Sequence, residues 1–124
     1  MEDLLARCKQ ERKTYVASEP GKGVQNAILD YRVVESRRDL SMVAIHLITG
    51  RTHQIRCQFS SRELPLVGDR KYSLNNDPCE IALWSHSLRF RHPVTGQALA
   101  FTAPPPQTQP WILFSQEVNG HVSL

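Results

Sequence analysis

The sequence lacks the features that mark membrane, secreted and metal-stapled proteins. No apolar run approaches the roughly 20 residues of a membrane span, and no basic stretch precedes an apolar core at the start, as it would in a signal peptide. The three cysteines, Cys8, Cys57 and Cys79, are widely spaced and form no CxxC motif. That usage favours a reduced compartment over a disulfide framework. Together these absences predict a cytoplasmic protein without membrane contact.

Motifs for nucleotides, serine hydrolases and metals are missing as well. The chain contains no GxSxG, P-loop or GxGxxG segment. Its five histidines show no shared ligand spacing, and Cys57 with His53 four residues earlier is a pair alone. Zinc requires more partners at recognisable spacing, so no metal site is expected. The helical position expected for Cys57 indicates packing rather than a nucleophile.

What is present is enough chain for one globular domain, with an uneven distribution of charge. The 124 residues are 40% hydrophobic and 22% charged, and the formal net charge is +3. Between Arg32 and Lys71 there are eight basic and four acidic residues, whereas the last forty residues carry little charge. A basic stretch inside a folded domain is compatible with a phosphate-backbone partner. A solvated basic surface explains the same charge equally well.

The first half of the chain predicts a helix followed by three strands. Good helix formers without Gly or Pro predict a short helix over residues 3–12, and residues 13–18 are typical of a strand. Residues 27–36 and 41–49, joined by a short polar linker, predict a hairpin. The nearly continuous apolar character of residues 41–49 indicates a central strand with both faces covered.

The second half predicts a helix, a second hairpin and a tail. Thr49 is a candidate N-cap for a helix that buries a stripe formed by Ile55 and Phe59. Strands are expected over 81–91, with Trp84, Leu88 and Phe90 in the core, and over 98–101. A short closing helix is expected over 110–117. The predicted class is α+β, a mixed and mostly antiparallel sheet with a few helices.

The densest polar cluster, residues 49–56, opens the predicted helix directly after a buried strand. A helix N-terminus presents free N–H groups and the positive end of the dipole, which attract carboxylate or phosphate. Arg51, expected in the first turn, adds a planar two-pronged donor for the same anion. The alternative is that Arg51 and Arg56 simply pair with surface acids, and the residues alone leave both possibilities open.

Five ordered segments together resemble the RluA-type RNA pseudouridine synthases. Residues 43–56, V-A-I-H-L-I-T-G-R-T-H-Q-I-R, resemble the family's hallmark "L-x-T-G-R-T-H-Q-I-R" segment, and residues 64–72, L-P-L-V-G-D-R-K-Y, look like its "P-I-x-G-D-x-x-Y". Residues 12–17, R-K-T-Y-V-A, are similar to its "K-x-Y-x-A" strand. Residues 82–93 and 101–105 look like its closing "L-x-F-x-H-P" and "F-x-A-P" segments. The match spans residues 3 to 105.

The resemblance implies an RNA-modifying isomerase that uses neither cofactor nor metal. In this family a catalytic aspartate attacks a flipped-out uridine, the glycosidic bond breaks, and the base is rejoined through carbon to give pseudouridine in rRNA or tRNA. By the resemblance, Tyr15 packs on the target base, and Arg51 ion-pairs with the aspartate and keeps it ionised. The further residues expected along the RNA-facing or structural side are Lys13, His53, Arg56 and Lys71.

The chain departs from the family pattern at the aspartate itself. The family's "H-R-L-D-x-x-T-S-G" segment lies upstream of the tyrosine strand, and none of the five aspartates here has that context. Residues 1–106 are therefore expected to be the C-terminal portion of a catalytic domain whose N-terminal half is missing, with residues 107–124 as a tail. A non-catalytic derivative that binds RNA or another partner is the alternative, and a decayed gene product is a third.

The first prediction follows from the missing aspartate. We expect the 124-residue chain alone to have no pseudouridine synthase activity, because nothing in it can attack the uridine. The measurement is tritium release from RNA labelled at its uridines. Turnover by the chain alone would show that the aspartate assignment is wrong.

Overall fold

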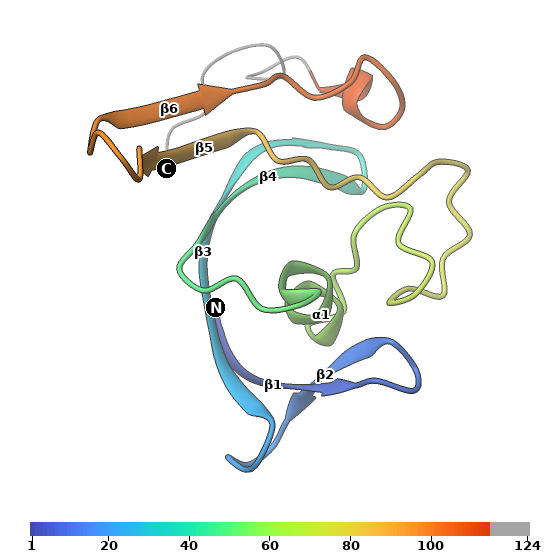
Figure 1. Cartoon of the computed structure of the whole chain (residues 1–124). Helices are drawn as coiled ribbons and strands as arrows, with labels where there is room; N and C mark the ends of the chain where they lie inside the picture. The colour runs from blue at the N-terminus through green and yellow to red at the C-terminus, as the bar shows by residue number, and fades with distance from the viewer. Residues whose placement is uncertain (115–124) are drawn as a thin grey trace.

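In the computed structural model, which describes residues 1–114, a curved antiparallel sheet lies against one helix (Figure 1). The sheet has four strands in the order β2-β1-β3-β4, and α1 lies on its concave side. A separate two-stranded sheet is formed by β5 and β6. The α+β class with antiparallel pairing is therefore confirmed. The elements in chain order are β1 (Glu2–Cys8), β2 (Lys13–Ala17), β3 (Val24–Arg37), β4 (Leu40–Leu47), α1 (Gln54–Ser61), β5 (Ser87–Arg91), β6 (Ala98–Thr102) and the 3₁₀ helix η1 (Trp111–Leu113).

The helix expected over residues 3–12 is wrong, because this segment is the strand β1. It pairs with β2 through Leu4–Cys8 on one edge and with β3 through Glu2–Ala6 on the other, so its middle residues have a neighbouring strand on both sides. Leu5 is 3% exposed and packs with Ala27, Cys57 and Tyr72 in the core. Helix propensity differs among these residues by only tenths of a kcal/mol, and two-sided sheet pairing outweighs it.

The hairpin expected from residues 27–36 and 41–49 is confirmed as β3 and β4, which pair from Leu29↔Leu47 to Arg37↔Leu40. A bulge between Val33 and Glu35 shifts the register in the middle of this hairpin. The central position expected for the second strand is wrong, since within the described residues β4 pairs with β3 alone. Hydrophobic pattern reports which faces of a strand are apolar, not how many neighbours it has.

The helix begins later than its sequence suggests. Its N-cap is His53, in the left-handed region at φ 54°, rather than Thr49. Thr49 instead donates its hydroxyl proton to Oε1 of Gln54 at 2.8 Å, and the same oxygen accepts the Arg51 N–H at 2.9 Å. The Gln54 side chain thus closes the loop before the helix. Arg51 lies in that loop and not in the first helical turn.

The buried side of α1 is more polar than expected. Phe59 is buried and meets Tyr31 edge-on at 5.4 Å, but Gln54, Cys57 and Gln58 are buried beside it. Gln58 is fully buried, and its amide donates to Asp3 Oδ2 at 2.9 Å and to the Ala27 carbonyl at 3.3 Å. The amide therefore ties the helix to β1 and β3. Burial raises the pKa of the Cys57 thiol, which agrees with a packing role.

The second hairpin is shorter and less buried than expected. The strand β5 begins at Ser87 rather than at residue 81, and the expected core stripe is largely exposed: Trp84 43%, Leu88 57% and Phe90 43%. Phe90 stacks instead on Phe101 of β6, with 5.9 Å between the ring centroids. The two strands pair only with each other in the described part of the chain, so each apolar side chain has few neighbours. Of the helix expected over 110–117, the structure shows η1 alone, and residues 115–117 lie outside the described residues.

A substitution in β1 tests its place in the core. Leu5→Ala is expected to lower the free energy of unfolding by about 2–4 kcal/mol, because Leu5 fills space between Ala27, Cys57 and Tyr72. The control is Val16→Ala, since Val16 is the register partner of Leu5 but is 43% exposed; we expect it to cost less than about 1 kcal/mol. Urea unfolding followed by circular dichroism measures both, and equal costs would contradict the inward placement of Leu5.

Candidate functional site

Polar side chains from four parts of the chain meet near the start of α1. Arg56 belongs to the helix, and His53 caps it. Lys13 comes from β2, and the loop between α1 and β5 contributes Asp69 and Tyr72. Segments that are distant in sequence therefore build one cluster.

An ion pair between Arg56 and Asp69 fastens the loop to the helix. Arg56 donates two parallel hydrogen bonds to the carboxylate, Nε to Oδ2 at 2.9 Å and Nη2 to Oδ1 at 2.8 Å. The Asp69 side chain is buried, and its Oδ1 also accepts the backbone N–H groups of Lys71 and Tyr72. Burial alone would raise the pKa of Asp69, but these donors hold it below its usual value of 3.8.

The turn before Asp69 requires glycine. Gly68 has φ 80°, a region that disfavours side chains, and a Cβ there would clash with the carbonyl of Glu80. The Gly68 N–H donates to Asp77 Oδ2 at 3.0 Å, and this hydrogen bond joins two parts of the loop between α1 and β5. The Gly-Asp pair of the "G-D-x-x-Y" segment therefore has a local explanation, because the glycine permits the turn that buries the aspartate.

Tyr72 connects β2, the helix start and the loop. Its hydroxyl accepts the backbone N–H of Thr14 at 2.7 Å and lies 2.9 Å from Nδ1 of His53. Two cations lie near its ring, with Lys13 Nζ at 5.2 Å and Arg56 Cζ at 5.0 Å from the centroid. Since Tyr72 is 8% exposed, this ring is part of the framework and is closed to ligands.

The imidazole of His53 lies between two guanidinium groups. Its Nε2 lies 3.3 Å from Arg56 Nη1, and a guanidinium can only donate. Its Nδ1 lies 3.4 Å from Arg7 Nη1 and 2.9 Å from the Tyr72 hydroxyl, so each ring nitrogen faces a guanidinium donor. Burial lowers the pKa of His53 below 6.5, and the positive charges of Arg56, Arg7 and Lys71 lower it further. His53 is consequently a neutral group at pH 7.

Tyr15 lies at the exposed edge of this cluster. Its ring is 42% exposed, and Lys13 Nζ lies 5.3 Å from its centroid, between it and Tyr72. The Tyr15 hydroxyl donates to Glu11 Oε2 at 2.8 Å, and that hydrogen bond raises the pKa of the phenol. Lys71 Nζ donates to the carbonyls of Glu11 and Arg12 at 3.1 and 2.9 Å. Tyr15 thus offers an accessible aromatic face beside cations.

Arg51 has no contact with this cluster in the described structure. Its Nε donates to the carbonyl of Asn26 on β3 at 2.9 Å, and no ion pair involves it among residues 1–114. Of the two surface pairings weighed from sequence, the structure shows an acid partner for Arg56 only, and that acid is buried. The structure therefore brings Lys13, His53 and Arg56 around Tyr72. Tyr15 and Lys71 lie beside this group, and Arg51 is separate from it.

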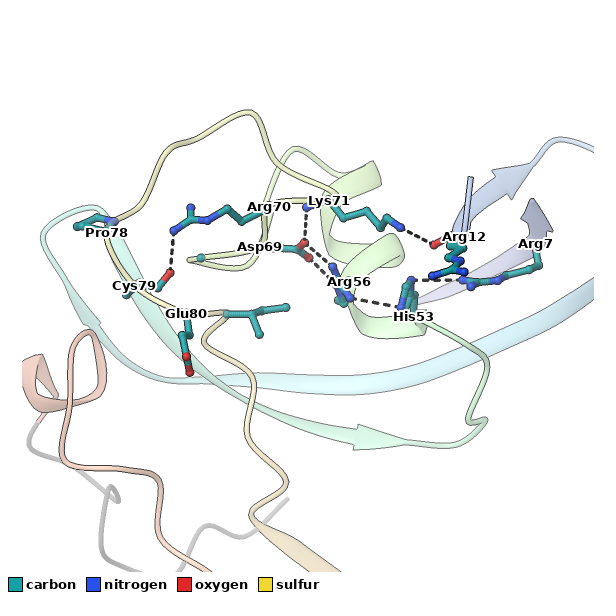
Figure 2. A pocket seen from close by; sticks show the side chains of 12 residues that line it. Arg7, Arg12, His53, Arg56, Asp69, Arg70, Lys71, Pro78, Cys79 and Glu80 are labelled. Carbon is teal, nitrogen blue, oxygen red and sulfur yellow. Dashed lines mark hydrogen bonds and ion pairs between the residues drawn. The ribbon is translucent and has the colours of Figure 1, made fainter. Parts of the chain in front are cut away.

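A cleft of about 990 Å³ opens beside the Arg56–Asp69 pair. Figure 2 shows Arg7 and Arg12 at one end of it and Arg70 on the opposite side of Asp69. The charged residues that line the cleft are five cations, Arg7, Arg12, Arg56, Arg70 and Lys71, and two carboxylates, Asp69 and Glu80. Since Asp69 is already paired with Arg56, the free charge in the cleft is mostly positive, which favours an anionic ligand.

The sequence alone does not predict that Arg7, Arg12 and Arg70 line the cleft, because it does not show in which direction a side chain points. A helix over residues 3–12 conceals that Arg7 and Leu5 share one face of a strand. Arg12 and Arg70 lie in turns, where sequence spacing says nothing about direction. Tyr72 belongs to a recognised motif, but the motif does not indicate its contacts. An alternation test on residues 2–8 would find Arg7, whereas no sequence signal would find Arg12 or Arg70.

Two further structural findings concern the described residues. No group of three or more His, Cys, Asp or Glu side chains gathers there in a way that suits a metal ion. None of the helices found in residues 1–114 is long and apolar enough to span a membrane.

Comparison with known proteins relates the chain to enzymes that modify RNA. A family model described as RNA pseudouridylate synthase matches residues 2–61. The uncharacterized RNA pseudouridine synthase YlyB of Bacillus subtilis (strain 168) is 35% identical over 118 residues, which cover 94% of this chain and 38% of that protein. Ribosomal large subunit pseudouridine synthase D of Vibrio cholerae is 34% identical over 117 residues, which cover 82% of this chain and 35% of that protein. The chain therefore spans well under half the length of these relatives.

Removing the charge of Asp69 tests the ion pair. Asp69→Asn is expected to lower the free energy of unfolding at pH 7 by about 2 kcal/mol, because Arg56 loses its partner in a partly buried site. Because the folded-state pKa of Asp69 is lowered, its contribution is complete above pH 3.8 and disappears as pH falls through the folded value. Urea unfolding between pH 7 and pH 3 should therefore show that the free energy of unfolding falls less on acidification in the variant than in the unchanged chain.

The control for this measurement is Asp39→Asn in the exposed turn between β3 and β4. We expect it to change stability by less than about 0.5 kcal/mol at either pH. Equal behaviour of the two variants would contradict the structural role of the Arg56–Asp69 pair.

Proposed function

The chain belongs to the RNA pseudouridine synthase family and covers part of the catalytic domain. On that basis we propose that it takes part in converting uridine in rRNA or tRNA to pseudouridine. In this proposal the chain supplies the surface that receives the RNA strand and the face on which the target base packs. The attacking aspartate comes from a segment with the family's "H-R-L-D" pattern. The observation that carries the proposal is the accessible Tyr15 ring beside the ammonium of Lys13.

Tyr15 suits the task of receiving an extruded uridine. A base leaves its stack at a cost of a few kcal/mol, which an aromatic surface at the destination offsets in part. The Tyr15 ring is available for this because its hydroxyl is held by Glu11 and its neighbour Lys13 lies between it and the closed ring of Tyr72. A phosphate on the same nucleotide would find positive charge close by.

Arg51 suits the task of holding a carboxylate. Only its Nε is engaged, by the Asn26 carbonyl, and its two terminal nitrogens have no partner among residues 1–114. A guanidinium with two free donors binds a carboxylate bidentately and stabilises its ionised form. Arg56 lacks this capacity, because Asp69 already occupies its donors. We therefore propose the pairing role for Arg51 and a structural role for Arg56.

The experiment transplants this chain into a relative. In the Bacillus subtilis relative, the aligned 118 residues are replaced by the corresponding residues of this chain, and tritium release from uridine-labelled RNA is measured. We expect turnover, and we expect Arg51→Gln to reduce it by about 100-fold or more, because the aspartate loses its ionic partner. Arg89→Gln, an exposed arginine on β5 outside the cleft, serves as the charge-matched control.

Measuring RNA binding by the chain alone tests RNA recognition independently of catalysis. The 124-residue chain should bind single-stranded RNA in a salt-sensitive manner, and Tyr15→Ala should weaken binding by about 5- to 100-fold through loss of stacking. RNA binding together with a folded but inactive chimera would favour the non-catalytic derivative. Failure of both measurements would contradict the proposed function.

A further inference from the structure

An arginine on β1, Arg7, lies on the inner side of the sheet. It follows Leu5 by two positions, so the two side chains leave the strand on the same face. Its register partner is Thr14, which is buried and donates its hydroxyl proton to the Thr52 carbonyl near the helix start. Arg7 therefore points along the face that packs against α1, yet its side chain is exposed in the cleft.

The neighbours of Arg7 give it no negative charge. Its Nη1 lies 3.4 Å from Nδ1 of His53, a neutral ring. The same imidazole lies between Arg7 and Arg56, and both guanidinium groups lower its pKa. No carboxylate pairs with Arg7 in residues 1–114. The arginine is thus held beside other cations, an arrangement that a bound anion would relieve.

Arg12 and Lys71 extend this positive surface. Arg12 lies in the turn between β1 and β2, and its carbonyl accepts a hydrogen bond from Lys71 Nζ at 2.9 Å. That contact holds the ammonium of Lys71 against the turn that carries the Arg12 side chain. Neither residue forms an ion pair with a carboxylate within the described chain. Arg70, at the other side of the cleft, donates to the carbonyls of Asp77 and Cys79.

We propose that Arg7 and Arg12 bind backbone phosphates of the RNA strand as it enters the cleft, with Lys71 beside them and Arg70 farther along. This inference rests on the proposed function and adds to it the path of the RNA backbone. The cations lie along the cleft rather than around one point (Figure 2). A single compact anion is best held by converging donors, whereas a strand with regularly spaced phosphates suits a row of them.

The test measures how salt weakens RNA binding. A labelled single-stranded RNA of about 12 nucleotides, long enough for several phosphates to reach the protein, is titrated with the 124-residue chain at several salt concentrations, and binding is followed by fluorescence anisotropy. In Arg7→Gln/Arg12→Gln we expect about tenfold weaker binding at low salt. We also expect the slope of log K against log salt to become shallower by about 0.7 for each phosphate that the variant no longer neutralises. Arg89→Gln/Arg91→Gln removes the same charge from β5 and should leave the slope unchanged.

A second arm distinguishes an RNA phosphodiester from free phosphate. Inorganic phosphate is added at constant ionic strength, and the resonance of His53, identified with a His53→Gln variant, is followed by NMR. RNA should shift this resonance in the unchanged chain and much less in the double variant, while millimolar inorganic phosphate should not displace the RNA. Displacement of the RNA by submillimolar phosphate would show a compact anion site and overturn the proposal.

The possible failures are distinguishable. If the unchanged chain binds RNA and the Arg7/Arg12 double variant binds it with the same affinity and salt slope, this inference is wrong and the proposed function stands. If the unchanged chain does not bind RNA at all, this inference is overturned, and the turnover of the chimera then decides whether the proposed function stands. If the β5 double variant weakens binding as much as the cleft variant, the effect is one of net charge and the cleft is not the path.

Discussion

The ion pair between Arg56 and Asp69 is the contact on which the site depends. It joins the helix to the loop that follows it, and the aspartate also accepts the N–H groups of Lys71 and Tyr72. The loop is thereby held where Tyr72 reaches Thr14 and His53. The pair acts together with the Gly68 N–H bond to Asp77 and the Lys71 bonds to the carbonyls of Glu11 and Arg12, and these contacts offset the entropy cost of ordering the loop. A buried pair is costly to break, because removing one partner leaves an uncompensated charge.

The sequence was sufficient to predict the β3–β4 hairpin and the existence of α1, but not the role of β1. Residues 2–8 contain leucine, alanine and arginine, which favour helix weakly, and only pairing with both β2 and β3 reveals the strand. Strand pairing is a long-range property, as the pairing of Glu2 with Ile28 shows. The exposed Trp84 and Phe90 illustrate the same limit, since apolar residues report a preference for burial and not whether a neighbour is present.

The sequence predicts site residues that lie within a motif, but not the contacts between segments that are distant in sequence. The resemblance grouped Lys13, His53, Arg56 and Lys71, and the structure brings the first three around Tyr72. It did not indicate that Asp69 neutralises Arg56, which is a contact across 13 positions between a helix and a loop. Nor did it reveal Arg7, because the face that a side chain occupies follows from secondary structure, and residues 2–8 form a strand where their composition predicts a helix.

The two arginines of the T-G-R-T-H-Q-I-R segment illustrate how local geometry divides similar residues between tasks. Arg56 lies within the helix, where its side chain meets a buried carboxylate and both edges of the guanidinium are used. Arg51 lies in the loop before the helix, closed by Gln54, and only one of its side-chain nitrogens is engaged. An arginine whose donors are all satisfied stabilises a fold, and one with free donors can bind an anion. The late helix start at Gln54 is what separates the two, because a helix beginning at Thr49 would have put Arg51 on its first turn.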